Sequence, residues 1–353
     1  MWPKVSIIWL NYNSSKFMPI ALRSLESVAE LDYPPDKYEL IVVDNCSTDG
    51  SYERIRDFLE KKSGLRKKLI RLNRNLGFTG GNNVGFAARD KESKYVLLLN
   101  NDAVLFQQGL KTLVEYGEND TNIAGLQGIV LKYGAKSVDT AGGYLNELLE
   151  PYTLGLHCEY PWALRKPMYV TYIDGCCAFY RVEGVLRSSG DKLFIDELFG
   201  YYDDTALGLM LWNRKYKLIV IPDVVAAHAR NLSFGKGKSS LSVYLSERNR
   251  VALSLVTNTR YKHVVLLRML RRALASAPRT ELGGFARVEI RALFDGMELG
   301  MRLRSKGLFM DLYKAPLVKI PLQDVWKFLV LGRLVTKYFA EWLGKNLRFL
   351  VVE

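Results

Sequence analysis

The stretches Val5-Ser-Ile-Ile-Trp-Leu-Asn-Tyr-Asn13 and Leu40-Ile-Val-Val-Asp-Asn-Cys-Ser-Thr-Asp-Gly50 decide the fold, because each begins with a short, largely apolar run without polar alternation and ends in polar residues. Unbroken apolar runs are typical of strands buried on both faces of a parallel sheet. Working outward, apolar runs lie at 5–10, 40–43, 68–72 and 95–99, and stretches with helical spacing at 17–28, 51–62 and 82–89. This alternation predicts an α/β fold with a mainly parallel sheet and helices on both faces.

Polar residues follow each of the four predicted strands. They are Asn11 to Asn13, Asp44 to Gly50, the glycine-rich stretch 73–85, and Asn100 to Asp102. Ligands of such sheets bind beyond the carboxyl ends of the strands. We therefore expect a binding site at this edge of the sheet.

Two carboxylates at these strand ends are candidates for ligand binding. Asp44 stands directly at the end of a strand, whereas nearby Asp49 fits a turn or helix cap better. Asp102 follows a very apolar run, and a lone carboxylate there suits a divalent cation that substrate phosphates also hold. A helix cap is the alternative for Asp102.

The glycine-rich stretch contains Gly77, Gly80, Gly81 and Gly85. Glycines let the backbone approach a ligand closely. The spacing matches neither the Walker loop nor the dinucleotide-binding GxGxxG pattern. A structural turn and a nucleotide-binding loop both remain open.

Composition excludes several classes of site. The 353 residues include four cysteines without a CxxC pair, and three histidines. A disulfide framework, a thiolate zinc site and a histidine-rich metal site are therefore not expected. The apolar run near the first residue is too short for a signal peptide, and no stretch reaches the roughly 18 apolar residues of a membrane span. We expect a cytoplasmic protein or one peripheral at the inner face of the cell membrane.

Four motifs in order carry a family resemblance: Val5-Ser-Ile-Ile-Trp-Leu-Asn-Tyr-Asn-Ser14, Val42-Val-Asp-Asn-Cys-Ser-Thr-Asp-Gly50, Asn75-Leu-Gly-Phe-Thr-Gly-Gly-Asn-Asn83 and Leu97-Leu-Leu-Asn-Asn-Asp102. Together they resemble the family 2 glycosyltransferases of GT-A fold, most closely the rhamnosyltransferase-like branch. The likeness continues through Phe194-Ile-Asp-Glu-Leu-Phe-Gly-Tyr-Tyr-Asp-Asp204 and Ile221-Pro-Asp-Val-Val-Ala-Ala-His228, and covers about residues 4–260. It implies a Rossmann-like GT-A domain that transfers sugar from a nucleotide-diphosphate sugar to a hydroxyl of a glycan or lipid-linked acceptor.

The resemblance also implies residue roles. Asp102 binds Mg²⁺ or Mn²⁺ on the donor diphosphate, with His228 beside it. Asp204 is the general base, and Asp203 supports it. The implied substrate-binding residues are Tyr12, Asp44, Asn75, Gly77, Gly80, Gly81, Asn82 and Asn101, with Tyr12 and Asp44 against the nucleobase.

Two residues depart from the family pattern. Asn100 stands at the first acidic position of the Asp-x-Asp motif, so the metal site has fewer charges. Asp203 replaces the family's Glu, which leaves open which member of the acidic pair does the work.

The predicted chemistry suits these residue types. Inverting transfer needs a general base for the acceptor hydroxyl and positive charge on the departing diphosphate. A carboxylate beside another carboxylate has a raised proton affinity, which suits a base. The alternative for Asp203 and Asp204 is an acidic pair favoured at a helix N-terminus, and for His228 a structural histidine.

We expect three parts along the chain. Residues 1–105 bind the nucleotide sugar, 106–240 supply the acceptor side and the base, and 241–353 form a basic, amphipathic helical region. Within 106–240, strands are expected at 169–180 and 218–221 and a helix at 201–215.

The last part carries most of the net charge of +13, with 20 Lys and Arg against 9 Asp and Glu. Its helices have apolar faces flanked by basic residues, as at 261–275. A second face comprises Phe328, Leu331, Val335, Phe339 and Trp342. Such faces are typical of helices on anionic membranes. Packing on the catalytic domain, or on a second subunit in a homodimer, is the alternative.

Other functions remain as alternatives. A sugar nucleotidyltransferase would place its glycine loop after the first strand, where this chain has Asn11-Tyr-Asn-Ser-Ser15. A nucleic-acid-binding protein would explain the charge, but no known module is visible and we expect no nucleic-acid partner. The third alternative is a membrane-surface protein that catalyses no reaction. The donor sugar, its nucleotide and the acceptor are left open.

Overall fold

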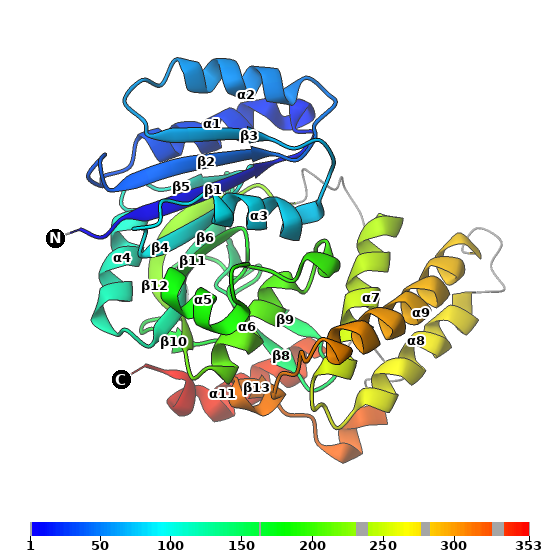
Figure 1. Ribbon diagram of the computed structural model, residues 1–353. Helices are drawn as coiled ribbons and strands as arrows, with labels where there is room; N and C mark the ends of the chain where they lie inside the picture. The colour runs from blue at the N-terminus through cyan, green and yellow to red at the C-terminus, as the bar shows by residue number, and fades with distance from the viewer. Residues whose placement is uncertain (1, 162–163, 231–238, 277–282, 327–334, 353) are drawn as a thin grey trace.

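The computed structural model describes residues 2–161, 164–230, 239–276, 283–326 and 335–352 (Figure 1). Its first hundred residues form the predicted alternation of strand and helix. The elements are β1 (Val5–Asn11), η1 (Ser15–Phe17), α1 (Met18–Ala29), β2 (Tyr38–Asp44), α2 (Ser51–Glu60), β3 (Lys67–Arg71), α3 (Gly77–Ala87) and β4 (Tyr95–Asn100). The four strands are parallel, in the order β3-β2-β1-β4. The predicted α/β fold is confirmed.

Helix α3 begins earlier than its spacing predicts and includes the glycine-rich stretch. A Cβ atom on Gly81 would lie 2.4 Å from Leu10 Cδ1, and one on Gly85 would lie 2.4 Å from Ile8 Cγ2. Glycine disfavours helix by roughly 1 kcal/mol relative to alanine, so tertiary packing overrides the local propensity here. The glycines let α3 lie directly on β1.

The middle of the chain widens this sheet and makes it mixed. Strand β11 pairs antiparallel with β4 and with β6, and β6 pairs parallel with β12. The elements are β5 (Ala103–Leu105), α4 (Gly109–Asn119), β6 (Ile123–Lys132), β7 (Val138–Thr140), β8 (Gly143–Asn146), β9 (Pro151–Thr153), β10 (Met168–Tyr169), β11 (Cys177–Arg181), α5 (Val182–Ser189), η2 (Asp196–Leu198), α6 (Asp203–Asn213) and β12 (Lys217–His228). Apolar cores cover both faces of the sheet.

The C-terminal part is mainly helical and lies against the sheet domain. Its elements are α7 (Ser240–Val256), α8 (Lys262–Ser276), α9 (Gly283–Ser305), η3 (Leu312–Lys314), β13 (Leu317–Val318), η4 (Leu322–Asp324) and α11 (Val335–Leu350). Helices α7, α8 and α9 gather beside the sheet, whereas α11 runs near β8 and β13 (Figure 1). Strand β13 pairs parallel with β8, so the region after residue 240 completes a small sheet with the region before it.

The apolar face predicted for the last helix packs inward. The rings of Phe339 and Tyr152 are stacked with centroids 4.7 Å apart, and Trp342 meets Tyr144 at 5.3 Å. The membrane interpretation of this face is therefore wrong for Phe339 and Trp342, because Tyr144 of β8 and Tyr152 of β9 already cover them. Phe328 and Leu331 lie outside the described residues, as does the side chain of Val335. Among the described helices, none is both long and apolar enough to cross a membrane.

Candidate functional site

The ends of β1 and β2 form a polar cluster around Asn11. Its Nδ2 donates to Asp44 Oδ1 at 2.8 Å, and Asp44 Oδ2 accepts from the Ser47 backbone N–H at 3.0 Å. Asp44 is buried within these contacts, while Tyr12 on the following loop is 43% exposed. The structure brings Tyr12 and Asp44 to the carboxyl edge of the sheet, and their contact with a nucleobase stays a prediction.

The predicted pocket residues at the start of α3 are occupied by contacts within the protein. Asn75 Oδ1 accepts from Asn45 Nδ2 at 2.9 Å and from the Gly77 N–H at 2.8 Å, and Asn82 Nδ2 donates to the Phe78 carbonyl at 2.8 Å. A Cβ atom on Gly80 would lie 2.6 Å from Leu76 Cβ. Asn75, Gly80, Gly81 and Asn82 thus have structural roles, and their contact with the donor stays a prediction.

Gly77 joins α3 to the loop before the acidic pair. Its φ is +73°, and a Cβ atom there would lie 2.2 Å from the carbonyl oxygen of Phe199. The same oxygen accepts from the backbone N–H of Phe78 at 2.7 Å. The free backbone N–H groups at the start of a helix commonly bind anions. At the start of α3, however, the Phe78 N–H already donates to the Phe199 carbonyl oxygen.

Asp102 and His228 meet although 126 residues separate them. Strand β5 pairs with β12, and Ala103 stands opposite His228. Asp102 Oδ1 therefore lies 3.0 Å from His228 Nε2, and both side chains are buried. Asn101, the neighbouring predicted residue, is also buried, with its Nδ2 3.5 Å from Asn11 Oδ1.

Two residues absent from the sequence prediction complete this cluster. Asp139 of β7 is fully buried and lies 2.9 Å from His228 Nδ1 through Oδ2. Arg230 Nε donates to both oxygens of Asp139, at 2.7 and 3.0 Å, and its NH2 group donates to Asp174 at 3.0 Å. The sequence could have indicated Arg230, because this basic residue stands two positions after the motif histidine His228. No such indication was available for Asp139, which follows no long apolar run.

The carboxylates on both ring nitrogens govern the charge of His228. Burial alone would lower its pKa, but Cys176 beside the ring and the hydrogen bonds to Asp102 and Asp139 raise the pKa well above its ordinary value. Asp139 also fixes the ring so that Nε2 faces Asp102, as the outer partner of a ligating histidine does.

Once Nε2 of His228 gives up its proton, as metal binding requires, a divalent ion fits Asp102 and His228 better than the neighbouring group of Asp139, Cys176 and His228. The ligand atoms of that second group lie within 4.8 Å of one another. However, Arg230 already neutralises Asp139, and burial raises the pKa of the Cys176 thiol far above neutrality. Asp102 supplies the carboxylate oxygen that Mg²⁺ and Mn²⁺ prefer, and two protein ligands leave room for phosphate oxygens.

The acidic pair Asp203 and Asp204 opens helix α6. Burial raises the pKa of Asp203 to about 6. Burial, then the charges of Asp203 and Asp174, raise the pKa of Asp204 well above its ordinary value. Asp204 Oδ1 accepts from the Thr205 N–H at 2.6 Å, while the side chain keeps partial exposure. A carboxylate of raised pKa with access to solvent is chemically equipped to accept a proton.

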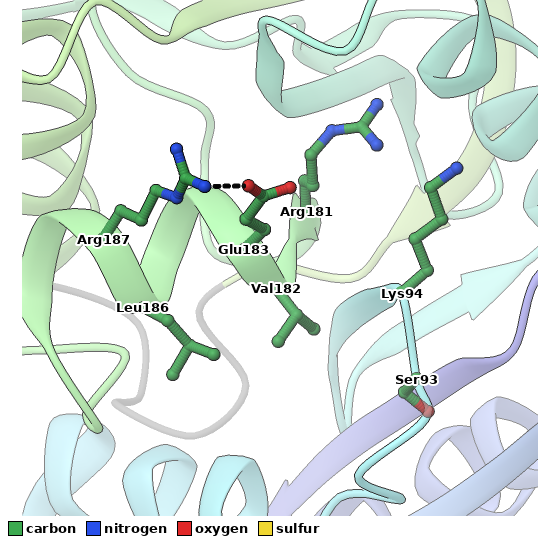
Figure 2. Close-up of a pocket in the computed structure, with 7 residues that line it drawn as sticks. All are labelled: Ser93, Lys94, Arg181, Val182, Glu183, Leu186 and Arg187. Carbon is green, nitrogen blue, oxygen red and sulfur yellow. Dashed lines mark ion pairs between the residues drawn. The ribbon is translucent and has the colours of Figure 1, made fainter.

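A hollow of about 410 Å³ lies at the opposite edge of the sheet, where β4 begins and β11 ends. Figure 2 shows Arg187 turned toward Glu183 within it, at 2.7 Å. Lys94 is paired with Glu118 at 2.7 Å, and Arg181 donates to main-chain carbonyls of Ile123 and Asp120. Since its charged side chains are paired and it lies at the other end of β4 from Asp102, we do not assign it to the site.

Comparison with known proteins shows which family the chain matches. The family model of glycosyl transferase family 2 matches residues 6–184. A poly(ribitol-phosphate) beta-N-acetylglucosaminyltransferase of Staphylococcus aureus, TarS, is 34% identical over 109 residues, which are 31% of this chain and 18% of that enzyme. An uncharacterized glycosyltransferase of Nostoc sp. is 31% identical over 112 residues, 32% of either chain. The match thus spans under a third of each relative.

Solved structures share the fold across nearly the whole chain. A mannosyltransferase of Pyrobaculum calidifontis, in complex with GDP-Man and Mn²⁺, gives a TM-score of 0.52 at 18% identity over 98% of this chain and 88% of that one. S. aureus TarS 1–349 with UDP-GlcNAc gives 0.54 at 19% identity over 98% and 91%. GalNAc-T7 with UDP, GalNAc and Mn²⁺ gives 0.62 at 15% identity over 95% and 58%. These likenesses show the GT-A fold, and with the family match over half of the chain, the protein belongs to glycosyl transferase family 2.

Proposed function

We propose that this protein is an inverting, metal-assisted glycosyltransferase that moves a sugar from a nucleotide-diphosphate sugar to a hydroxyl of a glycan or lipid-linked acceptor. One observation carries the proposal. Asp174 is ion-paired with Arg230 of the His228 network, and its charge also raises the pKa of Asp203 and Asp204. The candidate metal ligands and the candidate base are therefore electrostatically linked through one residue.

In the proposed reaction, Asp204 accepts the proton of the acceptor hydroxyl while the oxygen attacks the anomeric carbon. The bond from that carbon to the diphosphate oxygen breaks, and its electron pair leaves with the nucleoside diphosphate. A divalent ion at Asp102 and His228 would supply positive charge to the departing diphosphate. Asp139 keeps the His228 ring in place, and Asp203 keeps the proton affinity of Asp204 high.

The complexes of the solved neighbours support this donor class and this ion. They contain GDP-Man with Mn²⁺, and UDP-GlcNAc. We propose a nucleotide-diphosphate sugar and Mn²⁺ or Mg²⁺ for this chain as well. The division at residues 105 and 240 stays part of the proposal, with donor binding before the first boundary and the base before the second.

We further propose that the region after residue 240 contacts an anionic membrane through α8 and α9. Large apolar side chains lie exposed on these helices, at Leu267, Leu270, Ile290, Phe294 and Met301. Exposed arginines accompany them on the same helices, at 271, 291 and 302. Apolar side chains flanked by basic ones suit the anionic cytoplasmic leaflet.

The proposed activity is tested by release of nucleoside diphosphate. Purified protein is incubated with UDP-, dTDP- and GDP-sugars, with Mn²⁺, Mg²⁺ or a chelator. We expect metal-dependent release from one donor class, and thermal stabilisation by the same nucleotide. Absence of release and of stabilisation across the panel would contradict the proposal. Pyrophosphate production from a sugar phosphate and a nucleoside triphosphate would indicate a nucleotidyltransferase instead.

A further inference from the structure

The loop that precedes the acidic pair has an unusual backbone. Phe199, Tyr201 and Tyr202 have φ values of +64°, +67° and +63°. Residues with side chains rarely adopt this left-handed region, and such a conformation persists only where surrounding contacts enforce it. Tyr202 directly precedes Asp203, so whatever enforces this loop also sets the start of α6.

Asn249 of α7 donates side-chain hydrogen bonds to three main-chain carbonyls of this loop. Its side chain is fully buried, and its Nδ2 lies 3.0, 2.8 and 2.8 Å from the carbonyl oxygens of Leu198, Gly200 and Tyr201. Two N–H groups are thus shared among three main-chain acceptors. Arg248 Nε donates to Asn249 Oδ1 at 2.9 Å, which turns the NH2 end of the amide toward the loop.

Further contacts fix the loop from two sides. On the α7 side, an Arg248 NH2 group donates to the carbonyls of Glu197 at 2.9 Å and Leu198 at 2.7 Å. On the donor side, the Phe199 carbonyl accepts from the N–H groups at the start of α3. Helix α7 is itself held close to α9, because a Cβ atom on Gly296 would lie 2.5 Å from the Arg248 carbonyl oxygen.

We propose that Asn249 is a positioning residue for transfer: it holds the 198–202 loop so that Asp203 and Asp204 face the acceptor. This proposal rests on the proposed function. Asn249 acts through the main chain, since its side-chain hydrogen bonds go to carbonyls of the 198–202 loop and to Arg248, away from the cluster at β1 and β2. Its loss should therefore lower turnover and leave donor binding intact.

The test is Asn249→Asp, which keeps the size of the side chain and replaces the donating NH2 group by an oxygen facing three carbonyl oxygens. Turnover is measured as nucleoside diphosphate release, and donor-site binding as the Kd for UDP or GDP with Mn²⁺. We expect kcat to fall about 100-fold, the loss that a small misplacement of a catalytic group causes, while Kd changes less than about threefold. The acidic limb of the kcat–pH profile should also shift, since the burial of the acidic pair changes.

Val251→Ala is the matched control. Val251 is fully buried on the same helix and packs with Met269 and Ala292, so its truncation weakens α7 packing and removes no hydrogen bond to the loop. We expect a lowered Tm with kcat within about twofold of the wild-type value. If Asn249→Asp does not fold, Arg248→Leu is tested in its place. Arg248 is partly exposed, so its replacement disturbs the fold less, and it supplies two hydrogen bonds to the loop. We then expect kcat to fall about tenfold.

Amide hydrogen exchange of residues 198–205, measured without substrate, separates this inference from the proposed function. Faster exchange in Asn249→Asp than in Val251→Ala supports the part of the inference in which Asn249 holds the loop. If the wild type nevertheless releases no nucleotide, the proposed function fails while this hold on the loop stands. Three results would each overturn the inference. They are a wild-type kcat in a folded Asn249 or Arg248 variant, a loss of kcat in Val251→Ala as large as that in Asn249→Asp, and a loss of nucleotide affinity in Asn249→Asp as large as its loss of kcat.

Discussion

At the scale of single residues, His228 lies between two carboxylates with different environments. Asp102 faces the candidate metal position, whereas Asp139 is held by Arg230 and orients the ring. Removing an outer partner of a metal-ligating histidine generally costs about 10- to 100-fold in metal affinity or activity.

We predict that Asp139→Asn weakens Mn²⁺-dependent binding of UDP or GDP by about tenfold, and that Asp102→Asn weakens it further. Isothermal titration with and without Mn²⁺ measures both. Asp49→Asn is the control, because Asp49 is an exposed carboxylate that accepts from the Ser15 and Ser51 N–H groups. Unchanged metal dependence in Asp102→Asn would remove this residue from the metal site.

Asp203 gives a pH-dependent prediction about stability. Its pKa is raised from 3.8 to about 6 on folding, so the folded protein holds the proton more tightly than the unfolded chain. The free energy of unfolding therefore falls as the pH rises through this range. Asp203→Asn, which stays neutral, should raise the free energy of unfolding by on the order of 2 kcal/mol at about pH 7.5 and change it little at about pH 4. Urea unfolding at both pH values measures the difference, and an equal difference at both would contradict the raised pKa.

How far the sequence predicts the site depends on the residue. Asp102 and His228 could be predicted through family motifs. The local sequence pattern does not predict that they meet, because their approach depends on the pairing of β5 with β12 across 126 residues. Asp139 could not be predicted, since β7 is a three-residue strand placed by tertiary contacts alone. The contacts of Asn249 could not be predicted either, because the hydrophobic pattern of its helix does not indicate which main-chain carbonyls its side chain contacts.

At the scale of elements, the contact between α3 and β1 explains the glycines that a binding loop would also require. Gly81→Ala places a methyl group 2.4 Å from Leu10 Cδ1. We expect a loss of about 1–3 kcal/mol in the free energy of unfolding, as overpacking of a filled interior causes. Gly64→Ala is the control, because nothing lies within 4 Å of a Cβ atom there. Denaturant unfolding distinguishes them; a Gly81 variant as stable as wild type would contradict close packing.

The amphipathic pattern of the last helix shows a limit of sequence reasoning at this scale. A face of apolar residues predicts burial but does not name the partner. For Phe339 and Trp342 the partner is the pair of tyrosines on β8 and β9. The strands of the first hundred residues were predictable because the apolar runs of β1, β2 and β4 are buried on both faces, whereas β3 is a partly exposed strand at the edge of the sheet. The start of α3 was not predictable, since its glycines oppose local helix propensity.

At the scale of the whole molecule, the region after residue 240 contacts the sheet domain at several places. Strand β13 extends the sheet of β8 and β9, and α7 supports the loop before the acidic pair. Removal of residues after 240 should therefore impair folding of residues 1–240 rather than release an independent unit.

The membrane proposal is tested with the 353-residue protein carrying Leu267→Glu and Phe294→Glu. These side chains are 56% and 65% exposed, so the changes should leave the fold intact. We expect the wild type to sediment with phosphatidylglycerol vesicles more than with phosphatidylcholine vesicles, and the double variant to lose most of this binding. Leu186→Glu, at a 40% exposed position on α5, is the control. Unchanged binding, or a wild-type dimer that the variant dissociates, would overturn the proposal.

The most direct test of the account is the turnover of Asp204→Asn beside its nucleotide affinity. We predict that kcat falls by about 10²- to 10⁴-fold, the contribution of a general base, while the Kd for UDP or GDP with Mn²⁺ stays within about threefold of wild type. Wild-type turnover in a folded Asp204→Asn protein would contradict the assignment of Asp204 as the base.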